Sequence, residues 1–148
     1  MTPAPEDWSV GAALAPHSFT VTRADLRRYA AASGDPNPVH LEDSAAHAAG
    51  FDGVIAHGML TLALAGRALE EWAGGPGRVR DLRAKFTRPV LVPDDERGAV
   101  VQVGGVVRSV DERDDGLEVA IALEVTCGIV TVLGAPRAVV LVPGGSAR

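Results

Sequence analysis

The stretch GMLTLALAGRALEEWA, residues 58–73, decides the fold that we expect for this chain. Its first half is apolar nearly all round, a pattern typical of a helix that is buried on most sides. Charged side chains enter only from Arg67 onward, which indicates that the far end of the helix reaches water. The run GGPG at residues 74–77 then ends the helix.

Four β-rich segments follow this helix. Residues 79–90 begin with an alternation of apolar and polar side chains, the two-residue period of a half-buried strand. Residues 99–110 and 117–126 are longer β-rich runs joined by the charged turn DERDDG, and residues 129–142 form the last run. The segment after the central helix is therefore predicted to be all strand.

The segment before the central helix mixes a strand with short helices. Residues 17–21 (HSFTV) predict a short strand. Thr22, with Asp25 three residues later, predicts an N-cap and a capping box. The helix that begins there ends at Gly34, and residues 43–49 predict a second short helix.

Only one helix is apolar enough to cover the strands, and the strands need one face covered. The order of elements therefore predicts an α+β hot-dog fold, in which a curved antiparallel sheet wraps around a long central helix. We expect one domain over residues 1–148, with about 1–8 and 144–148 loose. The outer face or an edge of such a sheet commonly pairs with a second subunit, so a dimer is expected.

Composition narrows the functional classes. A net charge of −5 argues against a nonspecific nucleic-acid binder, which usually presents a basic surface. The single cysteine, Cys127, cannot form an intrachain disulfide, and the N-terminal residues contain no apolar run typical of a signal peptide. No stretch approaches the ~20 apolar residues that span a bilayer. We therefore expect a cytoplasmic protein that binds neither nucleic acid nor membrane.

The loop DPNPVH, residues 35–40, is the strongest candidate for chemistry. It carries a carboxylate, Asp35, and an imidazole, His40, on a segment that two prolines stiffen. Such a pair can hold one water molecule and move its protons, with one group as base and the other as acid. The structural alternative is a plain turn, because Asp, Asn and Pro are all common turn residues.

The start of the central helix, AHGM at residues 56–59, is the second candidate. The first N–H groups of a helix have no acceptor within it and lie at the positive end of its dipole. Gly58 has no side chain, so a substrate carbonyl can approach its N–H closely, an oxyanion-hole arrangement. The alternative is a helix entry where two elements pack closely, with His57 as a structural histidine.

Other polar side chains carry weaker signals. His17 and His47 lack clustered partners, so no metal site is predicted. A basic stripe runs along the segment after the central helix. Its members are Arg78, Arg80, Arg83, Lys85 and Arg88. The stripe is either a phosphate contact for the substrate's carrier or a solvated strand face.

Two segments together carry a family resemblance. YAAASGDPNPVH, residues 29–40, and GFDGVIAHGML, residues 50–60, resemble the MaoC-like (R)-specific enoyl hydratases. Within that family the chain is most similar to the catalytic subunit of actinobacterial (3R)-hydroxyacyl-ACP dehydratases. The similarity continues through FTRPVLVPD, residues 86–94, and more loosely through the remaining strands.

The resemblance implies a hydro-lyase that interconverts trans-2-enoyl and (3R)-3-hydroxyacyl thioesters of CoA or acyl carrier protein, in fatty-acid or related acyl metabolism. It implies no metal and no organic cofactor, and a homodimer or a heterodimer with a related hot-dog subunit. It assigns Asp35, His40 and Gly58 to catalysis. We further predict substrate contacts from Asn37, His57, Met59 and Arg88. Some relatives place a serine in the central helix at the position of Gly66, so polar help from that site is not expected.

Two alternatives stay open. A hot-dog thioesterase would direct water at the thioester carbonyl rather than at C3. A noncatalytic subunit would only hold acyl chains, although such a subunit should tolerate loss of Asp35 or His40, and both are present here.

Overall fold

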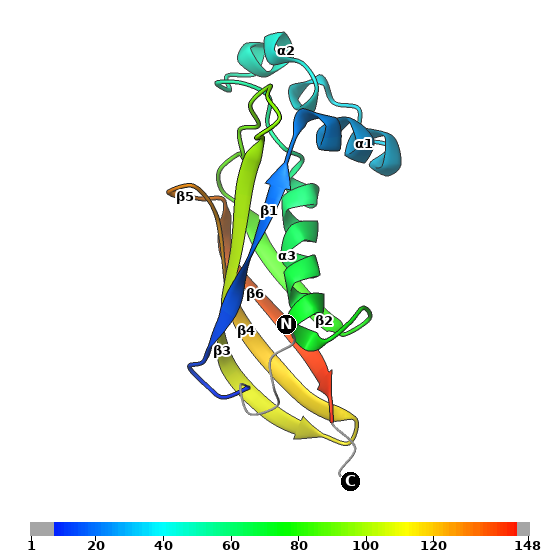
Figure 1. Cartoon of the computed structure of the whole chain (residues 1–148), viewed down its shortest axis with the longest axis vertical. Coiled ribbons are helices and arrows are strands. Elements are labelled where there is room, and N and C mark those ends of the chain that lie inside the picture. The colour runs from blue at the N-terminus through cyan, green and yellow to red at the C-terminus, as the bar shows by residue number, and fades with distance from the viewer. Residues whose placement is uncertain (1–7, 145–148) are drawn as a thin grey trace.

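The computed structural model describes residues 8–144 of the chain (Figure 1). The strands are β1 (Ala13–Val21), β2 (Val79–Phe86), β3 (Ala99–Arg113), β4 (Gly116–Cys127), β5 (Val130–Thr131) and β6 (Leu133–Pro143). The helices are α1 (Arg23–Ser33), α2 (Asp43–Ala48), α3 (Gly58–Ala73) and the 3-10 turn η2 (Pro38–His40). Every long element predicted from the sequence is present. The strand predicted over residues 17–21 is longer than expected, because β1 begins at Ala13.

One antiparallel sheet wraps around α3, which confirms the predicted hot-dog fold. The strand order is β1-β3-β4-β6-β2, with the short β5 paired to β4. Helix α3 contacts both outer strands, β1 and β2, and also β3 and β6, because the sheet curves around the helix (Figure 1). The smaller helices α1 and α2 lie beyond the N-terminal end of α3, at one end of the sheet.

The core lies between α3 and the inner face of the sheet. Alternate residues of β3 and β4 are buried there, as the two-residue period of a strand requires. They are Val101, Val103, Val107, Val119, Ile121 and Val125. From α3 the core receives Ala65, Ala68, Leu69, Trp72 and Ala73. Burial of this apolar surface is the main force that holds the helix in the sheet.

The start of α1 is capped as its sequence predicts. The Thr22 hydroxyl accepts the Asp25 N–H at 3.3 Å, and the Asp25 carboxylate accepts the Thr22 N–H at 2.8 Å. This backbone contact is the first cause of the lowered pKa of the Asp25 carboxyl. Gly34 ends the helix in the left-handed conformation, with φ of 72°, which a residue without Cβ adopts at little cost.

Two expectations need correction. Trp8 is only 5% exposed and belongs to the core cluster, so the loose segment predicted at residues 1–8 does not include it. Residues 1–7 and 145–148 lie outside the described residues. Helix α3 is also less enclosed than predicted, because Met59 is 57% exposed and Leu60 and Leu64 are half-buried. One sheet covers one side of the helix and leaves the opposite side open.

Among residues 8–144, no helix has the length and apolar character needed to cross a membrane.

Candidate active site

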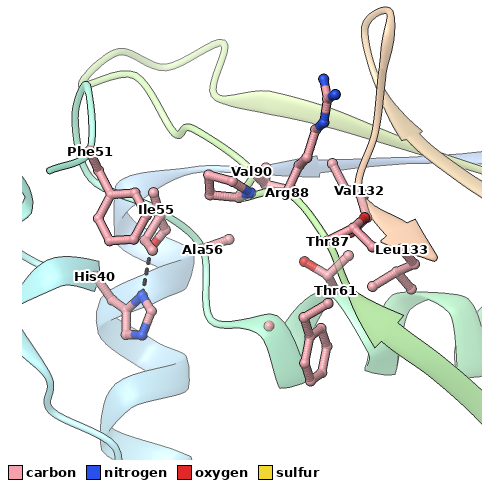
Figure 2. Close-up of a pocket in the computed structure, with 13 residues that line it drawn as sticks. His40, Phe51, Ile55, Ala56, Thr61, Thr87, Arg88, Val90, Val132 and Leu133 are labelled. Carbon is pink, nitrogen blue, oxygen red and sulfur yellow. Dashed lines mark hydrogen bonds between the residues drawn. The ribbon is translucent and has the colours of Figure 1, made fainter.

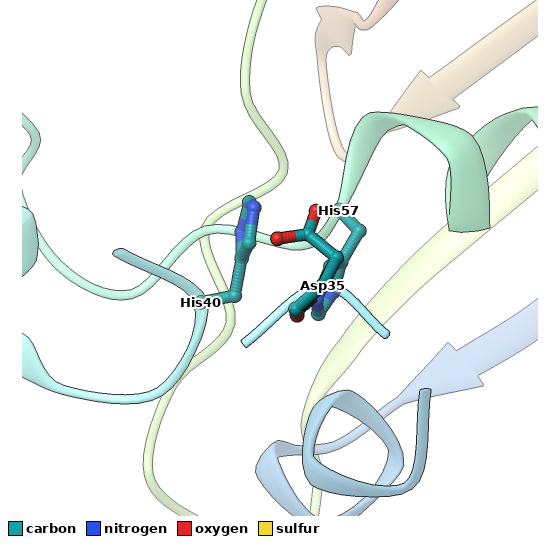
Figure 3. Close-up of side chains that lie close together, drawn as sticks. All are labelled: Asp35, His40 and His57. Carbon is teal, nitrogen blue, oxygen red and sulfur yellow. Dashed lines mark hydrogen bonds between the residues drawn. The ribbon is translucent and has the colours of Figure 1, made fainter. Parts of the chain in front are cut away.

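Two side chains of the loop after α1 meet a third from the entry to α3. Figure 3 shows them: Asp35, His40 and His57. One side-chain nitrogen or oxygen of each lies within 4.8 Å of those of the other two. Asp35 is exposed, His40 is half-buried and His57 is 2% exposed. The structure therefore brings together the two predicted acid–base residues and a buried histidine.

Hydrogen bonds from side chains to the backbone set the shape of the loop. The Asp35 carboxylate accepts the Asn37 N–H at 3.2 Å, and the Asn37 side-chain oxygen accepts the Val39 N–H at 3.2 Å. The second contact caps η2, a single 3-10 turn within the loop that the two prolines stiffen. Asn37 thus holds the loop, and a substrate contact from its amide stays a prediction.

His40 is fixed at one ring nitrogen. Its Nδ1 lies 2.7 Å from the Ile55 carbonyl oxygen. A carbonyl only accepts, so Nδ1 carries the hydrogen, and in the neutral ring Nε2 carries the lone pair. The Ile55 N–H in turn donates to the Val39 carbonyl at 3.2 Å. The backbone thus selects the tautomer that presents Nε2 as a base.

His57 lies behind this pair. Its Nε2–H donates to the Asp35 carbonyl oxygen at 3.2 Å, and its ring stacks on that of His40 with centroids 3.9 Å apart. Tyr29 contacts it from another side at 4.7 Å, edge to face. Its Nδ1 is buried without a hydrogen-bond partner among the described residues. His57 is only 2% exposed, and its contact with substrate stays a prediction.

Burial lowers the pKa of His57 below its ordinary value of 6.5, against the opposing effect of its bond to the Asp35 carbonyl. The unfolded chain therefore binds a proton at a pH where the folded chain does not. The free energy of unfolding should consequently fall as pH drops below 6.5, and this loss should level off below the folded pKa. Urea unfolding of wild type and His57→Gln at pH 7.5 and 5.5 tests this. A wild-type pH dependence no steeper than that of the variant would contradict it.

The three side chains do not form a good metal site as they stand. Imidazole binds a metal ion in the plane of its ring. The planes of His40 and His57 are only 26° apart and stacked at 3.9 Å, so one ion cannot lie in both. Each ring also has one nitrogen bonded to a backbone carbonyl.

A cavity of about 350 Å³ opens beside His40 (Figure 2). The lining residues come from the loop before α3, from the start of α3 and from the segments after β2 and β5. They are His40, Phe51, Ile55, Ala56, Gly58, Thr61, Phe86, Thr87, Arg88, Pro89, Val90, Val132 and Leu133. The walls are mainly apolar, and their polar side chains are those of His40, Thr61, Thr87 and Arg88. A mainly apolar cavity with a few polar groups is typical of a small-molecule site.

Gly58 is on the cavity wall, as its predicted role requires. As the first residue of α3, its N–H has no acceptor within the helix. The Leu60 and Thr61 N–H groups both donate to the His57 carbonyl, at 3.0 and 3.2 Å. A Cβ on Gly58 would lie 3.1 Å from the ring of Phe86, so the aromatic ring packs directly over the glycine.

The residues of the predicted basic stripe differ in their positions and partners. Arg88 alone of the stripe lines the cavity, and Figure 2 shows its guanidinium directed outward from the rim. Arg78 instead donates to the Ala73 carbonyl at 3.1 Å, and Arg83 pairs with Asp81 at 2.9 Å. Met59 is exposed and outside the lining, so its contact with substrate stays a prediction.

Sequence reasoning missed two side chains of this region. The edge contact of Tyr29 with His57 depends on how α1 docks, which the sequence does not show. Phe86 is 57% exposed and covers Gly58, although the alternation along residues 79–90 puts it on the same face of the strand as the half-buried Leu82 and Ala84. It is the last residue of the outer strand β2, where no further strand covers it.

Comparisons with known proteins agree with the hot-dog fold. A family model described as "MaoC like domain" matches residues 9–125. The 3-hydroxyacyl-thioester dehydratase X of Mycobacterium tuberculosis is 47% identical over 73 residues, which are 49% of this chain and 25% of that protein. The (R)-specific enoyl-CoA hydratase of Rhodospirillum rubrum is 31% identical over 86 residues, 57% of this chain and 60% of that protein. The solved (R)-hydratase of A. caviae is 28% identical with a TM-score of 0.77, over 91% of this chain and 97% of that chain. The chain thus spans a quarter of the first relative and 60% of the second.

Proposed function

Because the chain belongs to the MaoC-like domain family, we propose that it is a hydro-lyase that interconverts trans-2-enoyl and (3R)-3-hydroxyacyl thioesters. The observation that carries the proposal is the pairing of the Asp35 carboxylate with the free Nε2 of His40, at the edge of an apolar cavity. The (R) stereochemistry is supported by the names of the hydratases to which the chain is similar.

In the direction of hydration, a water molecule held between Asp35 and His40 Nε2 gives a proton to one of them as its oxygen bonds to C3. The electron pair of the double bond moves to C2 and the thioester carbonyl. A proton returned to C2 then completes the addition. Dehydration runs the same steps backward. An acid–base pair is enough for this chemistry, so we propose that no metal or organic cofactor takes part.

The N–H of Gly58 would stabilise the charge that develops on the thioester oxygen. Support comes from its place at the positive end of α3 and on the cavity wall beside His40.

Gly58→Ala should lower turnover clearly while the melting temperature changes little, because the added methyl group crowds the approach of the carbonyl and Ala is a better helix former than Gly. The methyl group would also contact the Phe86 ring closely, so that ring must move by a few tenths of an ångström. Its exposed position allows that shift. The measurement is kcat per folded molecule together with thermal unfolding.

The control separates the two contacts of that methyl group. Phe86→Ala removes the ring, so Gly58→Ala in a Phe86→Ala background crowds only the substrate. If turnover in that background is the same with Gly or Ala at 58, the proposed role of the Gly58 N–H is wrong.

For the carrier, we propose that Arg88 contacts a phosphate of CoA or of the carrier-protein arm. Its guanidinium lies at the cavity rim and is directed outward, where a long carrier would leave the site. Arg88→Ala should raise KM for an enoyl-CoA and leave KM for an enoyl thioester of unphosphorylated pantetheine unchanged. An equal rise for both substrates would remove Arg88 from carrier recognition.

A second hot-dog subunit, identical or related, would complete the assembly. The support is three exposed apolar side chains: Phe86, which lines the cavity, and Met59 and Leu91, which are next in the chain to the lining residues Gly58 and Val90. Light scattering of the purified chain tests for the homodimer. A monomer that gains both mass and activity with a related subunit would indicate the heterodimer.

We also propose a cytoplasmic location, supported by the single cysteine, which cannot form an intrachain disulfide.

The thioesterase alternative differs in its product. Hydration consumes the enoyl absorbance and keeps the thioester, whereas a thioesterase releases free thiol. Incubation of the chain with crotonyl-CoA and a thiol reagent distinguishes the two reactions, and thiol release would overturn the proposed function.

A further inference from the structure

We propose that His57 is a positioning residue that fixes the position and orientation of both members of the acid–base pair, Asp35 and His40. The inference rests on the proposed function and adds a role that lies behind the cavity rather than on its wall. His57 touches Asp35 and His40 and, at 2% exposure, is shielded from the substrate by them.

The backbone of His57 is anchored firmly enough for such a role. It is the N-cap of α3, and its carbonyl accepts the Leu60 and Thr61 N–H groups at 3.0 and 3.2 Å. Helix α3 is the central element of the core, so the packing of α3 fixes the position of His57. The ring of Tyr29 then contacts the imidazole from α1.

Two separate contacts of His57 hold the acid–base pair, Asp35 and His40, in place. The Nε2–H of His57 donates to the Asp35 carbonyl, which fixes the backbone from which the carboxylate extends. The ring face of His57 supports the ring of His40, whose Nδ1 is held by the Ile55 carbonyl. The hydrogen bond fixes one edge of His40 and the stack fixes its plane, so the direction of the free Nε2 is defined. Placement at this level matters because a displacement of about 1 Å can cost about 100-fold in rate.

The protonation state of His57 suits this role. A ring that donates from Nε2 and keeps Nδ1 bare is neutral, and burial favours that state. The groups that face it are Tyr29, Asp35 and His40. A neutral ring places no second positive charge against His40 when His40 takes up a proton during turnover.

Two variants separate the two contacts. His57→Gln keeps an N–H near the position of Nε2 and removes the ring, whereas His57→Phe keeps a ring and removes the donor. Each should lower kcat by roughly 10- to 100-fold and leave KM within about twofold, because positioning is lost and substrate contact is not. His47→Gln is the matched control, since the exposed His47 also bonds a backbone carbonyl, Asp52 at 3.1 Å, away from the pair. Its kcat should match wild type.

A second readout does not depend on activity. Nitrogen-15 NMR of the imidazoles shows which nitrogen of His40 carries the hydrogen. Wild type and His57→Phe should both show the Nδ1–H form of His40. His57→Gln should show a mixture of tautomers, because without the stack the His40 ring can turn away from the Ile55 carbonyl. If wild type hydrates no enoyl thioester, the proposed function fails while the NMR comparison still tests the positioning.

The inference would be overturned if both variants keep kcat within about twofold of wild type, or if they raise KM and leave kcat unchanged. An unaltered His40 tautomer in His57→Gln would likewise remove the stacking role. A variant that does not fold is recognised by its circular dichroism, and the other variant then decides the outcome.

Discussion

Asp35→Asn and His40→Ala should each lower the rate of enoyl-thioester hydration by about 100-fold or more, because each removes one partner of general acid–base catalysis. Asn at 35 keeps the shape of the side chain, and its amide oxygen can still accept the Asn37 N–H, but it has no charge with which to take a proton. Ala at 40 removes the free Nε2 and also the bond to the Ile55 carbonyl. Steady-state kinetics with crotonyl-CoA measures both effects.

Both variants should fold, because Asp35 is exposed and His40 is half-buried on a surface loop. Asp52→Asn and His47→Ala are matched controls, since they change the same residue types on α2 and in the turn that follows it, outside the cavity lining. Wild-type turnover in a folded Asp35→Asn or His40→Ala would remove that residue from the mechanism.

Trp72→Ala should lower the free energy of unfolding by about 3–5 kcal/mol, the usual cost of truncating a large buried aromatic side chain. Trp72 is 1% exposed at the C-terminal end of α3, and it fills the space above Gly105, where a Cβ would lie 3.2 Å from the indole. Its N–H donates to the Ala15 carbonyl at 2.8 Å and so ties α3 to β1. Urea unfolding monitored by circular dichroism gives the value.

Tryptophan-to-phenylalanine substitutions separate this hydrogen bond from packing. Trp72→Phe should cost about 1–3 kcal/mol, because the Ala15 carbonyl loses its donor. Trp8→Phe is the matched comparison, since Trp8 is also buried but its indole N–H has no partner in residues 8–144. A larger loss of stability for Trp8→Phe than for Trp72→Phe would show that the N–H of Trp72 contributes little.

The elements that the sequence predicts well are those whose cause is local. The cap at Thr22 and Asp25 depends on residues three apart, and the length of α3 follows from its apolar run and the glycines that end it. The sequence also predicts the loop from Asp35 to His40 as a site for chemistry, because its acid, its imidazole and its prolines are all contained in six residues.

The parts that the sequence predicts poorly depend on docking between distant segments. His57 lies 22 residues beyond Asp35, and only the packing of α3 against the loop puts its ring under His40. The alternation in β2 correctly indicates a strand, but it cannot show that Phe86 stands at the sheet edge and covers Gly58. The burial of Trp8 has the same kind of cause, because most members of the core cluster that includes it are far from it in sequence.

The most direct test of the central claim, water addition by Asp35 and His40, is the product formed from crotonyl-CoA. The purified chain, alone or with its partner subunit, should consume the enoyl absorbance and yield (3R)-hydroxybutyryl-CoA, and Asp35→Asn under the same conditions should yield about 100-fold less in the same time. Chiral analysis that finds the (3S) product, or a (3R) product formed equally fast by Asp35→Asn, would contradict the account.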